Sequence, residues 1–168
     1  MKRWRTHASR RQIRHVIDRL YCHIVWTTRD REPLIDVGLA RFLCKFLRGV
    51  ATQENARILE VGMVRTHVHL LVRTRPITDL VRLLQRLKGG SAAIAGKERH
   101  STERHRLRWA KGYSIHSLSP RSIAGVRQYL RAQPSHHPEV AIPGWSGDRP
   151  EYEPTGHDEW RSEMRRRV

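Results

Sequence analysis

The stretch VGMVRTHVHLLVRT, residues 61–74, decides how the rest of the chain is interpreted. Its β-branched and aliphatic residues are typical of strands, in which alternate side chains point to the same face. One face is apolar and consists of Val68, Leu70 and Val72. His67 and His69 lie on the opposite face, and the strand rise separates them by about 7 Å. Two interpretations stay open: an ordinary pair in a chain with eleven histidines, or two ligands of one metal ion.

The residues before this strand predict two more strands and a helix. Residues 57–64 have a strand pattern, and Arg65-Thr66 forms a two-residue link, so the two segments are predicted to pair as a hairpin. Residues 21–28 are rich in β-branched and aromatic residues and predict the first strand. Apolar residues recur at helical spacing over residues 39–51, which predicts a helix facing the core.

The residues after this strand predict a helix, a fourth strand and a last helix. The second helix is predicted from about Leu80 to Ile94, with Gly89-Gly90 either weakening it or permitting a close approach. The fourth strand is predicted over residues 109–118. Ser119-Pro120 then suits a helix start, and the helix is expected to run to about Gln133, where Pro134 ends it.

This order of elements predicts an α+β fold with a ferredoxin-like βαββαβ antiparallel sheet and an additional C-terminal helix. Two helices should cover the apolar face of the sheet, and the additional helix should cover the face with the histidines. We expect this domain to span residues 21–137. Residues 1–20 are interpreted as a basic arm or short helix, and residues 138–168 as a loosely structured extension, a nucleic-acid clamp or a dimer arm.

The charge of the chain predicts a polyanionic partner. The sequence has 33 Lys and Arg against 16 Asp and Glu, a formal net charge of +17, which makes nucleic acid the first candidate. No apolar run is long enough for a membrane span, and the basic N-terminus lacks a signal core. Cys22 and Cys44 form no CxxC motif, so a reduced cytoplasmic location is expected.

A second group of candidate site residues lies on the last predicted helix. Tyr129 and Gln133 are four residues apart, so they share one face of that helix. Both lie beside its apolar stripe, and packing of that stripe on the sheet would bring them near the histidines. Each also has a structural interpretation, as an aromatic at a helix edge and as a polar residue at a helix end.

Several of these segments resemble those of the single-tyrosine HUH transposases. This family includes the insertion sequence 200-like transposases and the REP-associated tyrosine transposases. The resemblance lies in YCHIVWTTRDREPLI at residues 21–35, HVHLLV at 67–72, WAKGY at 109–113 and YLRAQPSHH at 129–137. The spacing from HxH to Tyr-x-x-x-Gln is specific. Arg65-Thr66 stands where the family often has Pro and an acidic or amide residue.

The resemblance implies a metal-dependent single-strand DNA endonuclease and strand transferase. Tyr129 would be the nucleophile and form a 5′-phosphotyrosine. His67, His69 and Gln133 would hold a divalent ion, Mg²⁺ or Mn²⁺. The expected partner is single-stranded or hairpin DNA, with no nucleotide cofactor, because the chain has no P-loop motif. The expected location is the bacterial cytoplasm, with the nucleoid. Both a monomer and a homodimer remain open.

Further residues are candidates for DNA contact or for support of the site. Basic and polar residues are expected to contact DNA: Arg82, Arg86, Lys88, Ser91, Arg106 and Arg108. Trp26 or Trp109 could stack on unpaired bases or pack in the core. Tyr113 is the rival nucleophile, and His136 and His137 could support the site.

Two alternatives to a transposase are considered. One is a non-catalytic single-stranded nucleic-acid-binding protein of ferredoxin-like fold. Such proteins read bases with aromatic side chains on one face of the sheet. The corresponding face of this chain is predicted to have histidines instead. The other is a replication initiator or relaxase, which would be longer.

Overall fold

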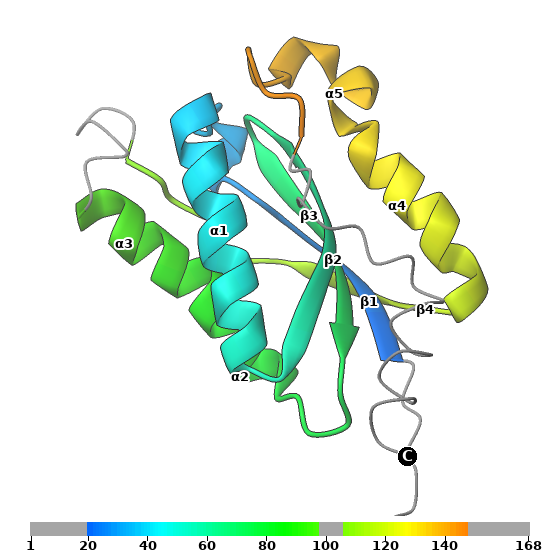
Figure 1. Ribbon diagram of the computed structural model, residues 1–168. Helices are drawn as coiled ribbons and strands as arrows, with labels where there is room; N and C mark the ends of the chain where they lie inside the picture. Colours follow the sequence, from blue (N-terminus) through cyan, green and yellow to red (C-terminus); the bar gives the residue numbers. More distant parts are fainter. Residues whose placement is uncertain (1–19, 98–105, 148–168) are drawn as a thin grey trace, which may run out of the picture.

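A computed structural model describes residues 20–97 and 106–147 (Figure 1). The predicted N-terminal arm and most of the predicted C-terminal extension lie outside these residues. No helix in the described part is long and apolar enough to cross a membrane. The described chain forms one sheet with helices on both faces, and packing continues beyond residue 137 because Ile142 belongs to the core.

The sheet has the predicted ferredoxin-like topology. Its strands are β1 (Leu20–Thr27), β2 (Ala56–Val64), β3 (His67–Thr74) and β4 (Ser114–Leu118). They are antiparallel in the order β2-β3-β1-β4. Val64 pairs with His67, so Arg65 and Thr66 form the tight hairpin link that the sequence predicted. The fold class is therefore confirmed.

Helices cover the apolar face of the sheet. After a 3-10 turn at Arg29–Arg31 comes α1 (Val37–Gln53), which begins where the side chain of Asp36 accepts a hydrogen bond from the backbone N–H of Leu39. The second helical region is α2 (Leu80–Gln85), η2 (Arg86–Gly90) and α3 (Ser91–Lys97). Their apolar side chains share one core cluster with alternate residues of β3. The β3 members are Val68, Leu70 and Val72.

The Gly89-Gly90 pair, for which the sequence left open a weaker helix or a close approach, lies in η2, a π-helical turn of the second helical region. A Cβ atom added at Gly90 would lie 3.0 Å from the ring of Phe46 on α1, whereas one added at Gly89 would meet nothing within 4 Å. The missing side chain at Gly90 therefore permits close packing of two helices.

The opposite face is covered by the last helical segments, which are η4 (Pro120–Ser122), α4 (Ile123–Arg131), α5 (Gln133–His136) and η5 (Pro138–Val140). Helix α4 packs on β2 and β3 (Figure 1). The prediction that one helix runs to Gln133 is wrong, because α4 ends at Arg131 and the chain turns at Ala132. Pro134 occupies the first turn of α5, where its missing N–H costs no hydrogen bond.

The fourth strand is shorter than predicted. Trp109 forms only an isolated bridge with Thr28, and continuous pairing with β1 begins at Ser114. Between them, the ammonium group of Lys88 donates hydrogen bonds to the carbonyl oxygens of Ala110, Lys111 and Gly112 at 2.8–3.1 Å. These carbonyl groups are turned toward one cation, which is incompatible with a regular strand ladder.

Candidate active site

His67 and His69 lie on the face of the sheet that α4 covers, as predicted. Both side chains are nearly buried, with 6% and 7% of their surfaces exposed, and their ring centroids are 5.0 Å apart. The hydroxyl of Thr66 lies 2.9 Å from Nδ1 of His67. This contact fixes the ring so that Nε2 points toward the last helices.

Gln133 reaches the histidines from the start of α5. Its side chain is fully buried, and its Oε1 lies 3.3 Å from Nε2 of His67. Its Nε2 has no hydrogen-bond partner among the described residues. A buried amide with an unpaired N–H group costs folding free energy, so the stability of the fold alone does not account for this side chain.

His23 is a member of the site that the sequence did not reveal. Nε2 of His23 lies 2.9 Å from Nδ1 of His69, and the two rings stack at 5.1 Å. The register pairs Val25 with His69, which places His23 on the same face as the predicted pair. Strand alternation alone could have suggested this face, but the neighbour of His23 depends on the pairing register.

Burial keeps these imidazoles neutral. It lowers the pKa of His69 to about 3, with smaller contributions from the nearby His67, His23 and His137. Burial also lowers the pKa of His67 and of His23. A histidine must be neutral to bind a metal ion, so the site holds its rings in the form that ligation requires.

The residues fit a divalent cation. Nε2 of His67 and Oε1 of Gln133 are 3.3 Å apart, close to the roughly 3 Å between adjacent ligands of an octahedral ion. His69 uses Nδ1 toward His23, which leaves Nε2 for a ligand bond. No three His, Cys, Asp or Glu side chains in the described residues form a metal-binding group. A set of three ligands that includes His67 and His69 would use the amide oxygen of Gln133, which faces Nε2 of His67.

Tyr129 lies at the rim of the same site. Its ring centroid is 5.8 Å from that of His69 and 6.3 Å from that of His23, with near-perpendicular planes in both pairs. The side chain is 41% exposed, although the neighbouring rings surround its base. The structure therefore combines an accessible phenol with buried imidazoles, in one chain.

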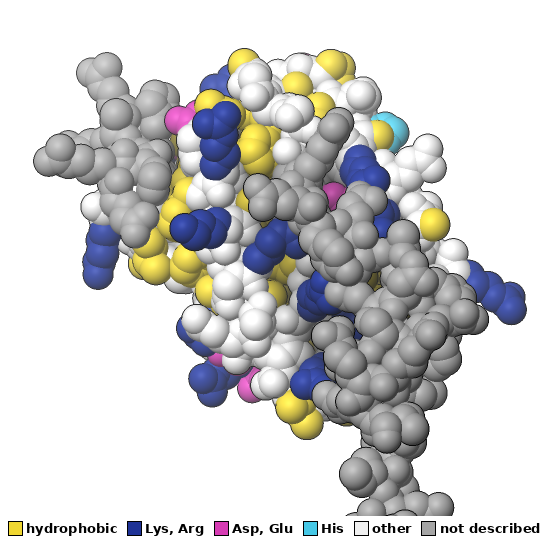
Figure 2. All heavy atoms as spheres, in the orientation of Figure 1, with side chains coloured by type: hydrophobic (Ala, Val, Ile, Leu, Met, Phe, Trp, Pro, Cys, Tyr) yellow, Lys and Arg dark blue, Asp and Glu magenta, His cyan; other side chains and the backbone are white. Residues whose placement is uncertain are grey.

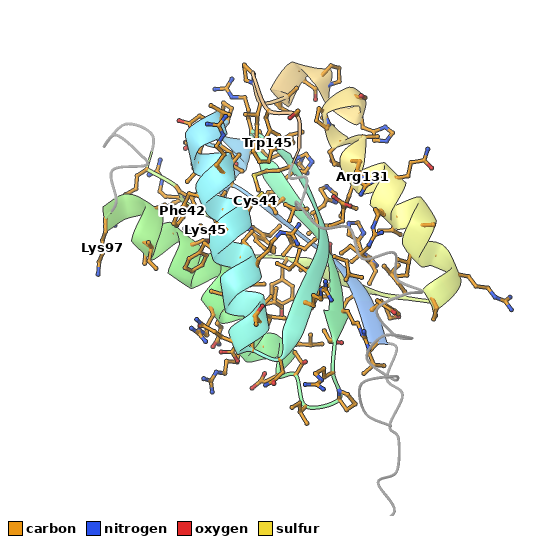
Figure 3. All side chains as sticks on the ribbon, viewed as in Figure 1. Phe42, Cys44, Lys45, Lys97, Arg131 and Trp145 are labelled. Atoms are coloured by element: carbon orange, nitrogen blue, oxygen red, sulfur yellow. The ribbon has the colours of Figure 1, made fainter. Side chains whose placement is uncertain are left out.

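Two contacts position α4 over β2. The carboxylate of Glu60, on β2 and 2% exposed, accepts a hydrogen bond from Nε of Arg131 at 3.0 Å, and Arg127 lies 3.6 Å away. A Cβ atom added at Gly62 would lie only 2.6 Å from the carbonyl oxygen of Leu130. The missing side chain at Gly62, which pairs with His69, therefore brings the end of α4 close to the histidines. Figure 3 labels Arg131 on α4.

Arg82 and Arg86 do not lie at this site. They belong to the helices on the opposite face, and both pair with Glu54 at the end of α1. Arg86 also donates a hydrogen bond to the side chain of Gln53 at 2.6 Å. Their predicted contact with DNA stays a prediction, and these ion pairs supply an alternative, structural role.

Lys88 and Ser91 have structural partners. Lys88 holds the loop before β4 through three backbone carbonyl groups. Ser91 is fully buried, and its hydroxyl accepts a hydrogen bond from the indole N–H of Trp109 at 2.9 Å. In this conformation the Ser91 hydroxyl has no exposed surface for a phosphate, because Trp109 covers it.

The remaining candidates are distributed around the domain. Arg108 pairs with Glu32, and Arg106 is exposed beside Gly96. Trp26 is 1% exposed and contacts Trp109 edge to face in the core, so core packing holds for both.

Tyr113 lies beside Lys88, with the ammonium group 5.6 Å from its ring centroid. Lys88 belongs to η2, which packs on the face of the sheet opposite the histidines, so Tyr113 lies on that side. Tyr113 is thus separated from the histidines by the sheet.

His136 and His137 both approach the site from α5 and its end. The ring of His136 is 5.1 Å from that of Tyr129, and the ring of His137 is 4.9 Å from that of His67. Among the described residues, these two rings contact the other members of the site without a side-chain hydrogen bond to them.

Comparisons with known proteins place the chain in a family. The family described as "Transposase IS200 like" matches residues 16–133. The ISDra2 transposase TnpA of Deinococcus radiodurans is 24% identical over 123 residues, covering 71% of this chain and 88% of that protein. The transposase for insertion sequence element IS200 of Salmonella typhimurium is 25% identical over 114 residues, covering 66% and 74%.

Two solved structures of similar fold are also described as transposases. A crystal structure described as a transposase from Deinococcus radiodurans has a TM-score of 0.56 and 25% identity, covering 79% of this chain and 98% of that one. A REP-associated tyrosine transposase bound to a REP hairpin has a TM-score of 0.59 and 14% identity, covering 83% and 76%. The second likeness concerns the fold alone. Because the family match spans most of the chain, this protein belongs to the IS200-like transposase family.

Proposed function

We propose that this transposase cleaves and rejoins single-stranded or hairpin DNA, with Tyr129 as the nucleophile. The observation that carries the proposal is the position of the Tyr129 ring, 5.8 Å from His69 and at the rim of the buried histidine site. The phenol and the ligand candidates come from elements far apart in sequence, and packing of α4 on the sheet brings them together.

The covalent step is a transesterification. The Tyr129 oxygen forms a bond to phosphorus while the bond to the 3′ oxygen breaks. The phenolic proton is released, and the departing 3′ oxygen takes up a proton. The products are a 5′-phosphotyrosine and a free 3′-OH. Attack by a 3′-OH on the phosphotyrosine reverses the step, so rejoining needs no nucleotide cofactor.

A divalent ion, Mg²⁺ or Mn²⁺, would be held by His67, His69 and Gln133. When bound, it supplies positive charge to the non-bridging phosphate oxygens. The ligands are neutral, so they leave the charge of the ion undiminished. Thr66 and His23 orient the two imidazoles through their Nδ1 atoms, at 2.9 Å in both cases.

The DNA partner is supported by charge and by a related structure. The formal net charge of +17 favours a polyanion, and the REP-associated tyrosine transposase of similar fold is bound to a REP hairpin. Tyr129 lies beside the histidines of its own chain, which supports action in cis.

The test is a cleavage assay with an end-labelled hairpin oligonucleotide that carries single-stranded flanks. We expect cleavage with Mg²⁺ or Mn²⁺, none in EDTA, and none by Tyr129→Phe. Tyr113→Phe is the matched control and should cleave normally, because Tyr113 lies on the other face of the sheet. Cleavage by Tyr129→Phe, or cleavage in EDTA, would contradict the proposal. Binding of DNA without any cleavage would favour the non-catalytic alternative.

A further inference from the structure

A cleft away from the histidines lies between α1 and the segment after α5. Its volume is about 370 Å³, within the range of small-ligand sites. Its lining comprises Arg41, Cys44, Lys45, Arg48, Trp145, Ser146 and Gly147. Figure 3 shows Trp145 near Cys44 and Lys45 on α1, and Figure 2 shows Lys and Arg side chains over this face. The lining contains three basic residues and no acidic one.

Two of these cations differ from the other basic candidates. Arg82, Arg86 and Arg108 are each paired with a glutamate. Within residues 20–97 and 106–147, no carboxylate lies within ion-pair distance of Arg41 or Lys45, and both side chains are exposed. They are four residues apart on α1 and so lie on one side of it. Their charges are available to an external anion.

Trp145 adds an aromatic surface to the cleft. Its side chain is partly exposed and packs against the core cluster, which holds it in place. By contrast, Trp26 is 1% exposed and Trp109 is held by Ser91. A fixed indole beside cations that no described carboxylate neutralises is the combination with which proteins bind single-stranded nucleic acid, by stacking on a base and contacting the backbone phosphates.

The cleft is connected to the histidine site by one short segment. Gln133 lies at the histidines, and the carbonyl oxygen of Val140 accepts a hydrogen bond from the backbone N–H of Arg65 in the hairpin link. Ile142 then enters the core, and its carbonyl oxygen accepts one from the N–H of Trp145. The segment therefore runs from the site, around the end of β2 and β3, to the cleft.

We propose that this cleft binds an unpaired nucleotide of the DNA that flanks the cleaved phosphate. The base stacks on Trp145, and Arg41 and Lys45 contact the adjoining phosphates. This inference rests on the proposed function for its ligand, because it assumes that the transposase acts on DNA with single-stranded flanks. It adds a second point of attachment for that DNA, on the opposite face from the histidines.

The test is equilibrium binding of fluorescent oligonucleotides by anisotropy, in EDTA so that no cleavage occurs. The probes are a blunt hairpin, the same hairpin with a single-stranded extension, and the extended hairpin made of RNA. We expect Trp145→Ala to weaken binding of the extended DNA hairpin about tenfold, the effect typical of one lost stacking contact. Binding of the blunt hairpin should be unchanged.

Charge variants test the cleft independently of Trp145 and should not affect folding. We expect the double variant Arg41→Gln, Lys45→Gln to weaken binding of the extended hairpin and to reduce its salt dependence by between one and two phosphate contacts. The matched control removes two positive charges elsewhere, in Arg75→Gln, Lys97→Gln, and should have a smaller effect. Equal losses in the two double variants would overturn the proposal, as would unaltered binding by Trp145→Ala.

The outcomes separate this proposal from the proposed function. A protein that cleaves DNA through Tyr129 but binds the extended and blunt hairpins alike would refute the cleft and leave the nuclease intact. A protein that never cleaves DNA, but whose binding of the extended hairpin is weakened by Trp145→Ala, would refute the nuclease and leave the cleft intact. A greater dependence on Trp145 for the RNA probe than for the DNA probe would overturn the assignment to DNA.

Discussion

The two faces of the sheet are built on different principles. On one face, Val68, Leu70 and Val72 pack with α1, α2, η2 and α3 into a single apolar cluster. On the other, His67, His69 and Gln133 are also buried, yet they are polar, and Nε2 of Gln133 has no hydrogen-bond partner among the described residues. Both faces belong to the same strand, β3. The alternation of one strand thus separates stability from chemistry.

The comparison explains how the fold can tolerate the unpaired amide nitrogen of Gln133. Burying an amide or imidazole without full hydrogen bonding costs about 1–3 kcal/mol per group. The apolar face offsets this, since each buried aliphatic side chain contributes about 1.5–3 kcal/mol. Variants on the apolar face should therefore mainly lower stability, and variants on the histidine face should mainly lower activity.

The largest difference should come from paired alanine variants of β3. We expect His67→Ala or His69→Ala to abolish metal-dependent cleavage, because each removes a ligand, while the free energy of unfolding changes less than in Leu70→Ala. Leu70→Ala should lower that free energy by about 2–5 kcal/mol through loss of core packing. The measurements are hairpin cleavage and urea unfolding. A folded His69→Ala protein that still cleaves would remove His69 from the site.

The next largest effect should come from Gly62, where one substitution should lower both stability and activity. Gly62→Ala would place Cβ 2.6 Å from the carbonyl oxygen of Leu130, so α4 must shift. We expect a loss of stability of about 1–3 kcal/mol and slower cleavage, because Tyr129 and Gln133 move with the helix. Gly49→Ala is the control. Nothing lies within 4 Å of its Cβ, and a helical alanine should stabilise the protein by up to about 1 kcal/mol. Equal cleavage by both variants would contradict this role of Gly62.

Acid should destabilise the histidine face. Burial lowers the pKa of His69 from 6.5 to about 3, so below pH 6.5 the unfolded chain binds more protons than the folded one. The stability is fully present above pH 6.5 and is lost as the pH falls toward 3, by about 2 kcal/mol at pH 5 for this one group. Urea unfolding of the metal-free protein at pH 7.5 and pH 5 measures the loss. His69→Asn should lose correspondingly less, and an equal loss in the two proteins would argue against a neutral, buried His69.

A smaller effect is expected at His23, which supports a ligand instead of being one. His23→Ala removes the partner 2.9 Å from Nδ1 of His69. Loss of such a partner typically weakens metal affinity by about tenfold or somewhat more. Calorimetric titration with Mn²⁺ measures it. His116→Ala is the control, because the exposed ring of His116 lies 6.4 Å from that of His23 and is not a partner of His69. The Mn²⁺ affinity of this variant should be unchanged. The same affinity in both variants would contradict a positioning role.

The fold could be predicted because its information is local. Strand alternation over residues 61–74 assigned Val68 and His67 to opposite faces, and helical spacing assigned α1 to the core. These patterns depend on periodicity alone, which the sequence displays directly. The family resemblance then connected Tyr129 and Gln133 to the histidine pair, and the structure places all of them together.

The features that escaped prediction depend on contacts between distant segments. The break at Ala132 was missed because Pro134 suits a helix start as well as a helix stop. His23 depends on the register of β1 against β3. The role of Arg82 depends on Glu54, 28 residues away. Composition identifies the excess of positive charge, but only the fold shows which cations already have a partner.

The most direct measurement is identification of the residue that becomes covalently joined to DNA. The protein would be incubated with Mn²⁺ and a hairpin oligonucleotide, digested, and analysed by mass spectrometry for a peptide that carries a nucleotide. We expect a single adduct on Tyr129, linked to a 5′ phosphate, and none in Tyr129→Phe. An adduct on Tyr113 or on any other residue would contradict the central claim that the phenol of α4 acts at the histidine site.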